Sequence, residues 1–380
     1  MTQLHLSGFK KMNENRVSTA HSSSFRFNKT ALVAATLMLT ACSTLGPSTI
    51  ERDRSDYATV IATTWKEQTL LNIVKLRYAD APVYLEVSSV ISSTAIQSQV
   101  NLSASWFSGS PAEGNSQTLG ASGLYTDRPT ISYTPLSGER FSRYLLTPLS
   151  PAAIFSLIQA GYPVDRVLHL TTRAANGLYN RSTSPSRLRS ADPEFYAVLD
   201  ALRRIQRSEK LGMRISQRAG ADSELLLIAD TRSEIVENDR RLVRQSLHLR
   251  PDAEVLHLTF GSVQRNDSEV ALLTRSMSEI FSEIAATIDA PPIHVQEGRA
   301  NPAPALPVVS SEWDAPLVRI FSSEHKPDNA YAAVRYRDHW FWIDDRDLRS
   351  KSEFLFILVL LSLAETGVAP ETPVITIPAN

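Results

Sequence analysis

The amino-acid sequence predicts an α+β fold, in which helices pack against mixed, mainly antiparallel sheets. Segments with helical spacing and segments with β-type alternation follow one another without strict alternation, which favours α+β over a doubly wound sheet. The composition, 43% hydrophobic and 21% charged, is that of an ordinary globular protein. With about 150 residues per domain as a prior, the mature part of the 380-residue chain is expected to form one or two domains.

Helices are predicted where apolar residues recur at three- and four-residue spacing behind a capping residue. The apolar run Phe354–Ala364 is too short to cross a membrane, so a buried helix is expected there, opened by a Ser350–Glu353 capping box. The other helices are expected over 55–78, from Ser150-Pro151 to Ile158, from Asp192-Pro193 to Ile205, over 232–246 and over 267–288.

Strands are predicted where β-branched and aromatic residues alternate with polar ones. Residues 108–123 are rich in Gly, Ser and Pro, and they are expected to be a long loop inside a hairpin. The expected strands are Val83–Val87, Thr130–Thr134, Val164–Leu170, a Met213–Asp230 hairpin, Glu254–Phe260, Leu317–Phe321, Tyr331–Tyr336, His339–Ile343 and an edge strand at Pro373–Ile377.

Domain boundaries are placed at shifts in composition, the clearest of which is a proline-rich stretch before residue 310. The predicted regions are 1–41 as a signal peptide, 42–52 as a tether, 53–210 as an N-terminal α+β region, 211–290 as a central α/β region, 291–309 as a proline-rich linker and 310–380 as a C-terminal β-hairpin and helix region.

Cys42 is the only cysteine, and it ends the run Leu39-Thr40-Ala41-Cys42. The apolar stretch before it is shorter than the roughly 20 residues that span a bilayer, and basic residues precede that stretch. This pattern resembles the lipobox of bacterial lipoproteins. The resemblance implies diacylglycerol on the Cys42 thiol, cleavage before Cys42 and acylation of the new amino terminus.

The resemblance also implies a subcellular location. Ser43, rather than aspartate, follows the cysteine, which in enterobacterial lipoproteins implies export to the outer membrane. We therefore expect a protein anchored through Cys42 at the periplasmic face of that membrane, with a possible envelope protein as partner. With its one cysteine consumed by lipid, the fold cannot contain a disulfide.

The charge balance disfavours nucleic acid as a partner. The leader carries five basic residues and one acidic residue, so its removal changes the formal net charge from −1 to −5. Residues 173–250 remain basic, with fifteen Arg or Lys against ten Asp or Glu. This imbalance fits either an anionic partner such as lipid headgroups or ordinary solvated helix faces.

Residues 339–347 hold the most suggestive constellation. Asp344, Asp345 and Asp347 could bind a hard cation such as calcium, or they could cap the following helix and pair with nearby arginines. Trp340 and Trp342 make one strand face aromatic, which indicates either core packing or a surface for a glycan or a protein.

Two blocks of the chain, residues 72–82 and 340–352, are similar to blocks in uncharacterised bacterial lipoproteins. The resemblance covers much of the mature chain. It brings no established activity, so it implies no catalytic residue and no cofactor.

Signatures of catalysis are missing from the sequence. It contains no Gly-x-Ser-x-Gly elbow, no His-Glu-x-x-His pair and no phosphate-binding glycine loop. Ser323 and Lys326 match a Ser-x-x-Lys spacing, but the companion motifs of penicillin-interacting serine enzymes are absent. The leading hypothesis is a non-enzymatic binding or scaffolding role in the cell envelope. The alternatives are a hydrolase of cell-wall or glycan substrates using the three aspartates, and a small-ligand carrier, which would need an apolar pocket.

Overall fold

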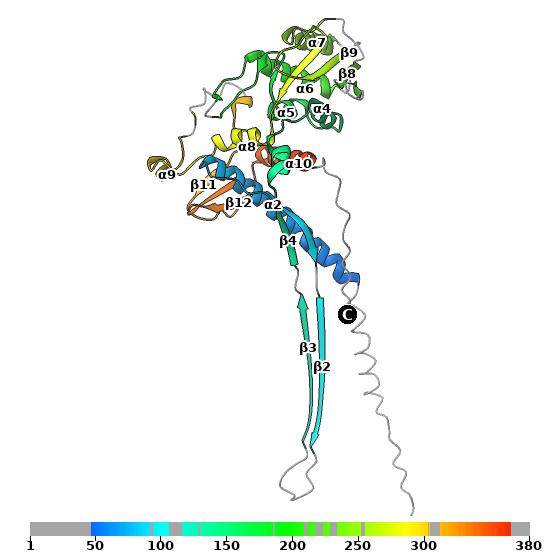
Figure 1. Cartoon of the computed structure of the whole chain (residues 1–380), viewed down its shortest axis with the longest axis vertical. Coiled ribbons are helices and arrows are strands. Elements are labelled where there is room, and N and C mark those ends of the chain that lie inside the picture. The colour runs from blue at the N-terminus through cyan, green and yellow to red at the C-terminus, as the bar shows by residue number, and fades with distance from the viewer. Residues whose placement is uncertain are drawn as a thin grey trace, which may run out of the picture. The chain divides into compact units, whose positions relative to one another are not determined.

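A computed structural model of the chain shows helices and mixed sheets, and this confirms the predicted α+β class (Figure 1). The chain divides into two compact units, residues 1–61 and 62–380. The structure describes residues 47–91, 94–105, 116–127, 130–184, 187–208, 212–216, 223–228, 234–251, 255–302, 304 and 312–365.

The helices are α2 (Pro47–Arg77), α3 (Gly138–Phe141), the π-helix η2 (Ser142–Leu146), α4 (Pro151–Gln159), α5 (Val164–Thr171), α6 (Pro193–Arg207), α7 (Glu234–Ser246), α8 (Met277–Ala286), α9 (Pro292–Gln296), the 3-10 helix η4 (Glu312–Asp314) and α10 (Leu348–Glu365). The strands are β1 (Leu85–Ile91), β2 (Thr94–Ser105), β3 (Ser116–Asp127), β4 (Thr130–Pro135), β5 (Thr172–Ala175), β6 (Leu178–Tyr179), β7 (Gly212–Ser216), β8 (Ser223–Ile228), β9 (Val255–Phe260), β10 (Glu269–Thr274), β11 (Phe321–Ser323), β12 (Ala330–Tyr336) and β13 (His339–Asp344). Within these residues, no helix is long and apolar enough to cross a membrane.

A six-stranded sheet in the order β6-β5-β10-β9-β8-β7 organises much of the second unit. Neighbouring strands in this sheet are antiparallel, except for β9 and β10, which run parallel to each other. The sheet joins β5 and β6 to strands that follow residue 211, so it takes strands from both sides of the boundary expected at 210. Asn176 stabilises this junction, because its amide bonds the backbone of Leu247, Glu269 and Ala271 at 2.7–3.0 Å.

Helices α4, α5 and α6 cover one face of this sheet. Ser150 caps α4 by accepting a hydrogen bond from the Ala153 amide at 3.2 Å, and Pro151 occupies the first turn, as the sequence predicts. Phe155, Leu168 and Leu199 come from the three helices, and together with strands β9 and β10 they surround a small apolar cavity of about 70 Å³. The helices therefore meet the sheet through their apolar faces.

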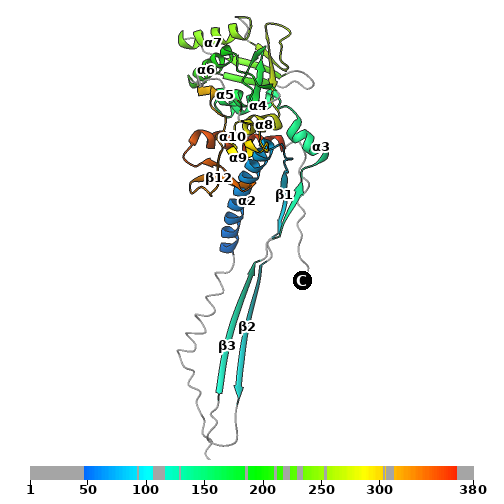
Figure 2. The same ribbon diagram turned by 90° about the vertical axis from the view of Figure 1, so that its left-hand side faces the viewer.

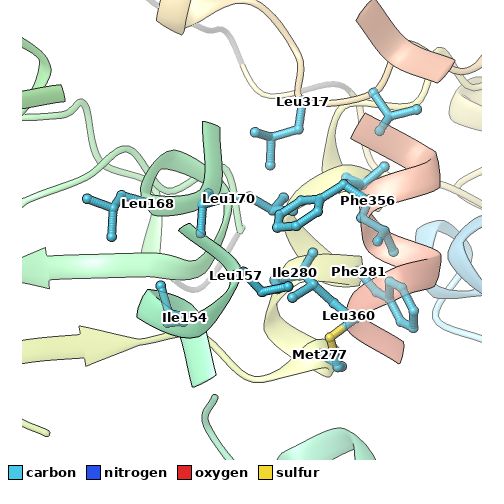
Figure 3. Close-up of a cluster of buried hydrophobic side chains, with 14 of the residues drawn as sticks. Ile154, Leu157, Leu168, Leu170, Met277, Ile280, Phe281, Leu317, Phe356 and Leu360 are labelled. Atoms are coloured by element: carbon cyan, nitrogen blue, oxygen red, sulfur yellow. The ribbon is translucent and has the colours of Figure 1, made fainter. Parts of the chain in front are cut away.

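The core continues from these helices to α8 and α10. Figure 3 shows Ile154 and Leu157 of α4, residues of α5, the α8 side chains Met277, Ile280 and Phe281, and the α10 side chains Phe356 and Leu360. All of these side chains belong to one buried cluster. The prediction that residues 354–364 form a core helix rather than a membrane span is thus confirmed.

The C-terminal region contains a three-stranded sheet in the order β11-β13-β12. Strands β12 and β13 are joined by the two-residue turn Arg337-Asp338, whose φ angles of 47° and 66° are those of a type I′ hairpin turn. Phe341 and Ile343 of β13 are fully buried against the core. The predicted hairpin and its turn are confirmed here.

Residues 164–170, predicted to be a strand, form helix α5 instead. Val164, Asp165, Val167, Leu168 and His169 are all buried, so polar and apolar positions on every side of this segment are covered by protein. Val164, Val167 and Leu168 lie at helical spacing, with Asp165 and His169 on the opposite side, so the segment does carry a helical pattern. The strand prediction overlooked it. Pro163 lies just before the first turn, where a helix accepts the residue readily.

Residues 267–288, predicted to be one helix, are divided into strand β10 and helix α8. Val270 and Leu272 pair with β9, which places the first part of the segment in the six-stranded sheet. Ser276 then starts the helix through a capping box with Glu279, with both bonds at 3.1–3.2 Å. The capping box lies inside the predicted helix and marks its true start.

Two further expectations about helix starts are corrected. Helix α10 begins at Leu348 and is capped by Asp347, which accepts hydrogen bonds from the Ser350 amide at 3.1 Å and the Ser350 hydroxyl at 2.7 Å. The predicted Ser350–Glu353 box is therefore wrong, and Glu353 instead pairs with Arg166. Helix α2 begins at Pro47, so the end of the expected tether is helical.

Candidate binding groove

An open groove of about 980 Å³ lies between helix α2, the start of β1 and strand β12. We call it the α2–β12 groove. Its floor is one face of α2, its first wall is formed around Val83 and Leu85, and its second wall is β12. The lining residues are Thr63, Thr64, Glu67, Gln68, Leu71, Asn72, Lys75, Val83, Leu85, Tyr133, Lys326, Pro327, Asp328, Ala330–Arg335 and Trp340.

The floor already holds one extended segment through side-chain amides. Asn72 is buried, and its amide both donates to the Val83 carbonyl at 2.9 Å and accepts from the Val83 amide at 3.0 Å. Gln68 lies one turn earlier, and in its hydrogen-bonding orientation its amide makes the same pair of bonds to Leu85, at 3.3 and 2.8 Å.

The two amides fit an extended chain because the spacings match. Four residues of helix rise about 6 Å, and two residues of strand advance about 6.6 Å. Gln68 and Asn72 therefore meet alternate residues of one strand, as the backbone of a neighbouring strand would. This face of α2 binds extended backbone.

The opposite wall is the edge of a sheet. Among the described strands, β12 pairs with β13 alone, and it ends the three-stranded sheet. All of the consecutive residues from Ala330 to Arg335 line the groove, so the groove follows the length of this edge. An edge strand presents backbone donors and acceptors that can pair with another extended chain.

Apolar surface is gathered in the groove. Val83, Leu85 and Tyr133 are 47%, 40% and 49% exposed, although each is a large apolar or aromatic side chain. Trp340 lies on the other side, with the Lys326 ammonium 5.4 Å from its ring centre. Clustered exposed apolar residues with a polar rim mark interaction surfaces more often than scattered ones do.

Charges of both signs surround these apolar residues. They are Glu67, Lys75, Lys326, Asp328 and Arg335. Tyr331, whose ring faces the ammonium groups of Lys66 and Lys351 at 4.7 and 5.3 Å, adds an aromatic side chain held by cations. A lining of mixed sign suits a polypeptide better than a polyanion such as nucleic acid.

The two tryptophans have different environments. Phe341 between them is fully buried, whereas Trp342 packs on Phe321 with ring centres 5.1 Å apart and Trp340 lines the groove. The aromatic face expected from the sequence is therefore divided between local packing and the groove.

The predicted carboxylates are engaged in local pairs. Asp344 accepts hydrogen bonds from the Arg346 side chain and backbone at 2.8–3.1 Å, and these bonds lower the pKa of Asp344. Asp345 pairs with the Lys351 ammonium at 2.6 Å, and the third carboxylate caps α10 as described above. In the part of the chain that the structure describes, no three potential metal ligands are grouped around one point.

Ser323 and Lys326 do not face one another. The Ser323 hydroxyl donates to the His325 carbonyl at 2.7 Å, while Lys326 is directed at Trp340. Ser323 ends strand β11, so the helical spacing that a Ser-x-x-Lys pair needs is not present.

Other cavities offer less to a partner. The apolar cavity of about 70 Å³ under α4–α6 is well below the roughly 300–1,000 Å³ of typical ligand pockets. A polar cavity of about 220 Å³ is lined by Arg173 and Arg187, but both guanidinium groups pair with the same Glu279 oxygen, at 3.1 and 2.8 Å. Its positive charge is thus partly neutralised from within.

A buried histidine lies in a cluster of arginines beneath η4. His169 packs against Trp313 with ring centres 5.2 Å apart. Burial, together with the charges of Arg181 and Arg275, lowers the pKa of His169 well below its usual value. The folded protein therefore holds this imidazole neutral.

We expect His169 to make the protein less stable in mild acid. Below about pH 6.5 the unfolded chain binds a proton that the folded chain refuses, so the free energy of unfolding falls by up to about 1.4 kcal/mol per pH unit. The His169→Phe variant should lack this part of the slope between about pH 6.5 and 5 in urea titrations. Parallel curves for the wild type and this variant would contradict the assignment.

The predictions that lie outside the described part of the chain include the signal peptide at 1–41, the start of the tether at 42–46, the lipid attachment at Cys42 and the edge strand at 373–377. The groove itself was not predicted. Gln68 and Asn72 fall inside a correctly predicted helix, and their four-residue spacing was a visible signal. What they bind, however, depends on tertiary structure.

No protein-family model, curated protein or solved structure matches this chain. A functional proposal therefore depends on the geometry of the site and on the sequence.

Proposed function

We propose that this protein is a lipid-anchored component of the bacterial cell envelope with a non-enzymatic binding role, and that the α2–β12 groove binds an extended segment of an envelope protein. One observation carries the proposal. Among the described strands β12 pairs on one side only, and its other edge follows an open groove whose floor, helix α2, binds extended backbone of the same chain at Val83.

The expected mode is addition of a strand. The partner segment would pair its backbone with β12, and alternate side chains would contact the apolar wall or the charged rim. Backbone pairing supplies affinity in this mode, whereas the side-chain contacts supply selectivity. The lipobox-like sequence that ends at Cys42 supports the envelope location, because this pattern directs lipid anchoring in the bacterial lipoproteins that it resembles.

Photo-cross-linking from both walls tests this function. In separate full-length proteins, p-benzoylphenylalanine would replace Ala333 on β12 and Tyr133 on the opposite wall, and cell envelopes would be irradiated. We expect adducts from both positions to map by mass spectrometry onto the same short segment of one envelope protein. Leu355, which is 55% exposed on α10 and outside the groove, is the matched control and should give no such adduct.

Two outcomes would contradict the proposal. If all three positions capture the same proteins, the adducts reflect exposure rather than a site. If the adducts from Ala333 and Tyr133 fall on residues 366–380 of the same chain, the groove is filled by the protein's own C-terminal segment and is not a partner site.

A further inference from the structure

Strands β2 and β3 form an uninterrupted two-stranded ribbon, so residues 116–123, which were predicted to belong to a loop, form part of a strand instead. Their register pairs twelve residues on each side, from Thr94 with Asp127 to Ser105 with Ser116, without a bulge. Figure 2 shows these two strands as a long antiparallel pair. Among the described residues they join no other sheet, so the outer edge of each strand is unpaired there.

One face of the ribbon carries apolar residues. Directly opposed residues of an antiparallel pair share a face, and successive residues alternate between faces. The register opposes Ile96 to Tyr125, Val100 to Ala121 and Leu102 to Leu119, and these positions all share a face.

The other face is polar and uncharged. It carries Gln97, Gln99, Asn101 and Ser103, with Ser122 opposite Gln99 and one apolar residue, Leu124, opposite Gln97. Over both strands the only charged residue is Asp127, which lies opposite Thr94 on the apolar face, at the end nearest β4. A ribbon that faced water would be expected to carry charges on this face, as edge strands of soluble proteins do.

The dimensions of the ribbon are those of a membrane-crossing strand pair. A tilted strand needs about 9–11 residues to cross the hydrocarbon of a bilayer, and each strand here has 12. Tyr125 lies near one end of the ribbon, opposite Ile96, and aromatic residues at the ends of apolar segments are typical of membrane–water interfaces.

An isolated two-stranded ribbon is only marginally stable in water, because it can bury neither its apolar face nor its edges. Hydrocarbon would cover the apolar face. It offers no hydrogen bonds, however, and unpaired backbone groups are costly there, so the outer edges require pairing with further strands.

We propose that the β2–β3 ribbon inserts into a lipid bilayer with its apolar face toward the hydrocarbon, and that its outer edges pair with the ribbons of neighbouring copies of this chain. The ribbon is a different site from the α2–β12 groove, so either proposal can fail without the other. The protein would then contact the membrane through this ribbon as well as through a lipid on Cys42.

Site-directed quenching tests the insertion. Full-length lipid-modified protein carrying Val100→Cys or Asn101→Cys would be labelled with a polarity-sensitive fluorophore and reconstituted into phosphatidylcholine vesicles with nitroxide-labelled acyl chains. We expect strong quenching from position 100 and weak quenching from the adjacent position 101. Equal quenching at both positions, or none at either, would overturn the proposal.

Charge variants and chemical cross-linking complete the test. With the reporter at Ile96→Cys, Val100→Arg should lower the inserted fraction about tenfold or more, whereas the matched Asn101→Arg should leave it nearly unchanged. Chemical cross-linking of the vesicles should give oligomers of this chain for the wild type and lose them for Val100→Arg. A ribbon that inserts as a monomer, or Val100→Arg inserting as well as the wild type, would refute the proposal.

Discussion

Replacing Glu283 with alanine is expected to lower the free energy of unfolding by about 3–5 kcal/mol. Glu283 lies on α8 and is almost fully buried, and it accepts hydrogen bonds from the Ser182 hydroxyl at 2.5 Å and the Thr183 hydroxyl at 2.7 Å. Burial raises the pKa of Glu283, but the charge of Arg275 and these hydrogen bonds outweigh it, so its pKa lies below the usual value.

Removal of the carboxylate leaves buried charge and buried donors. Arg275 is wholly enclosed and donates to the carbonyls of His169 and Leu170 at 3.1 and 3.0 Å, so it cannot move to water without breaking those bonds. The loss should be measured by urea denaturation followed by circular dichroism. Glu283→Gln, which keeps the volume and one acceptor, should lose less. Glu139→Ala, at a carboxylate 82% exposed, should change stability by less than about 0.5 kcal/mol.

The same group has a defined pH dependence. Because the folded pKa is depressed, its stabilisation is present above the unfolded pKa of about 4.3 and is lost as pH falls through the folded value. Glu283→Ala should therefore lose less stability than the wild type on acidification in this range. An alanine variant as stable as the wild type at neutral pH would contradict the role assigned to this carboxylate.

Replacing Phe281 with alanine is expected to cost about 3–5 kcal/mol of unfolding free energy, because the ring is fully buried and its removal leaves a cavity. The ring stacks on Tyr84, with centres 6.3 Å apart and planes 10° from parallel, and it lies beside Ile280 and Leu360 in the core (Figure 3). It thus connects α8 to the segment that leads into β1.

Thermal and urea unfolding of Phe281→Ala should both shift, with an unchanged dependence on denaturant if the core unfolds as one unit. Phe281→Leu, which restores part of the volume, should recover a share of the loss. Leu355→Ala, which removes a side chain 55% exposed on α10, should stay within about 0.5 kcal/mol of the wild type. A small effect at Phe281 would show that the core collapses around the cavity.

Local sequence patterns predicted the fold class and the elements whose ends are marked by capping, proline or turn residues. Ser150-Pro151 and Asp192-Pro193 mark the starts of α4 and α6, and the Arg337-Asp338 turn joins β12 to β13. At these places the residue type itself restricts the backbone, so no knowledge of the tertiary structure is needed.

Elements buried on all sides were harder to predict. Residues 164–171 and 269–274 are both short, and nearly every residue in them is buried. Periodicity separates a buried face from an exposed one, so it is a weaker guide where protein covers both faces. The helices and strands that cover such a segment are distant in the sequence, so the local sequence does not indicate how it is buried.

Local sequence patterns could not predict the α2–β12 groove, for a related reason. It brings Gln68 and Asn72 together with β12, more than 250 residues later in the chain. The sequence instead drew attention to the acidic cluster after β13. Those carboxylates pair with nearby cations and cap α10, which is the alternative to metal binding that the sequence also indicated.

The amide pairs of α2 recognise their neighbour by its main chain alone. Asn72 and Gln68 make hydrogen bonds to the N–H and C=O groups of Val83 and Leu85, and every residue type except proline provides both groups. Related sequences are therefore free to vary at 83 and 85 while the two amides on the helix stay fixed, with proline alone forbidden at the paired positions. Variable residue types at 83 and 85 beside invariant amides at 68 and 72 would be the evolutionary evidence for this contact.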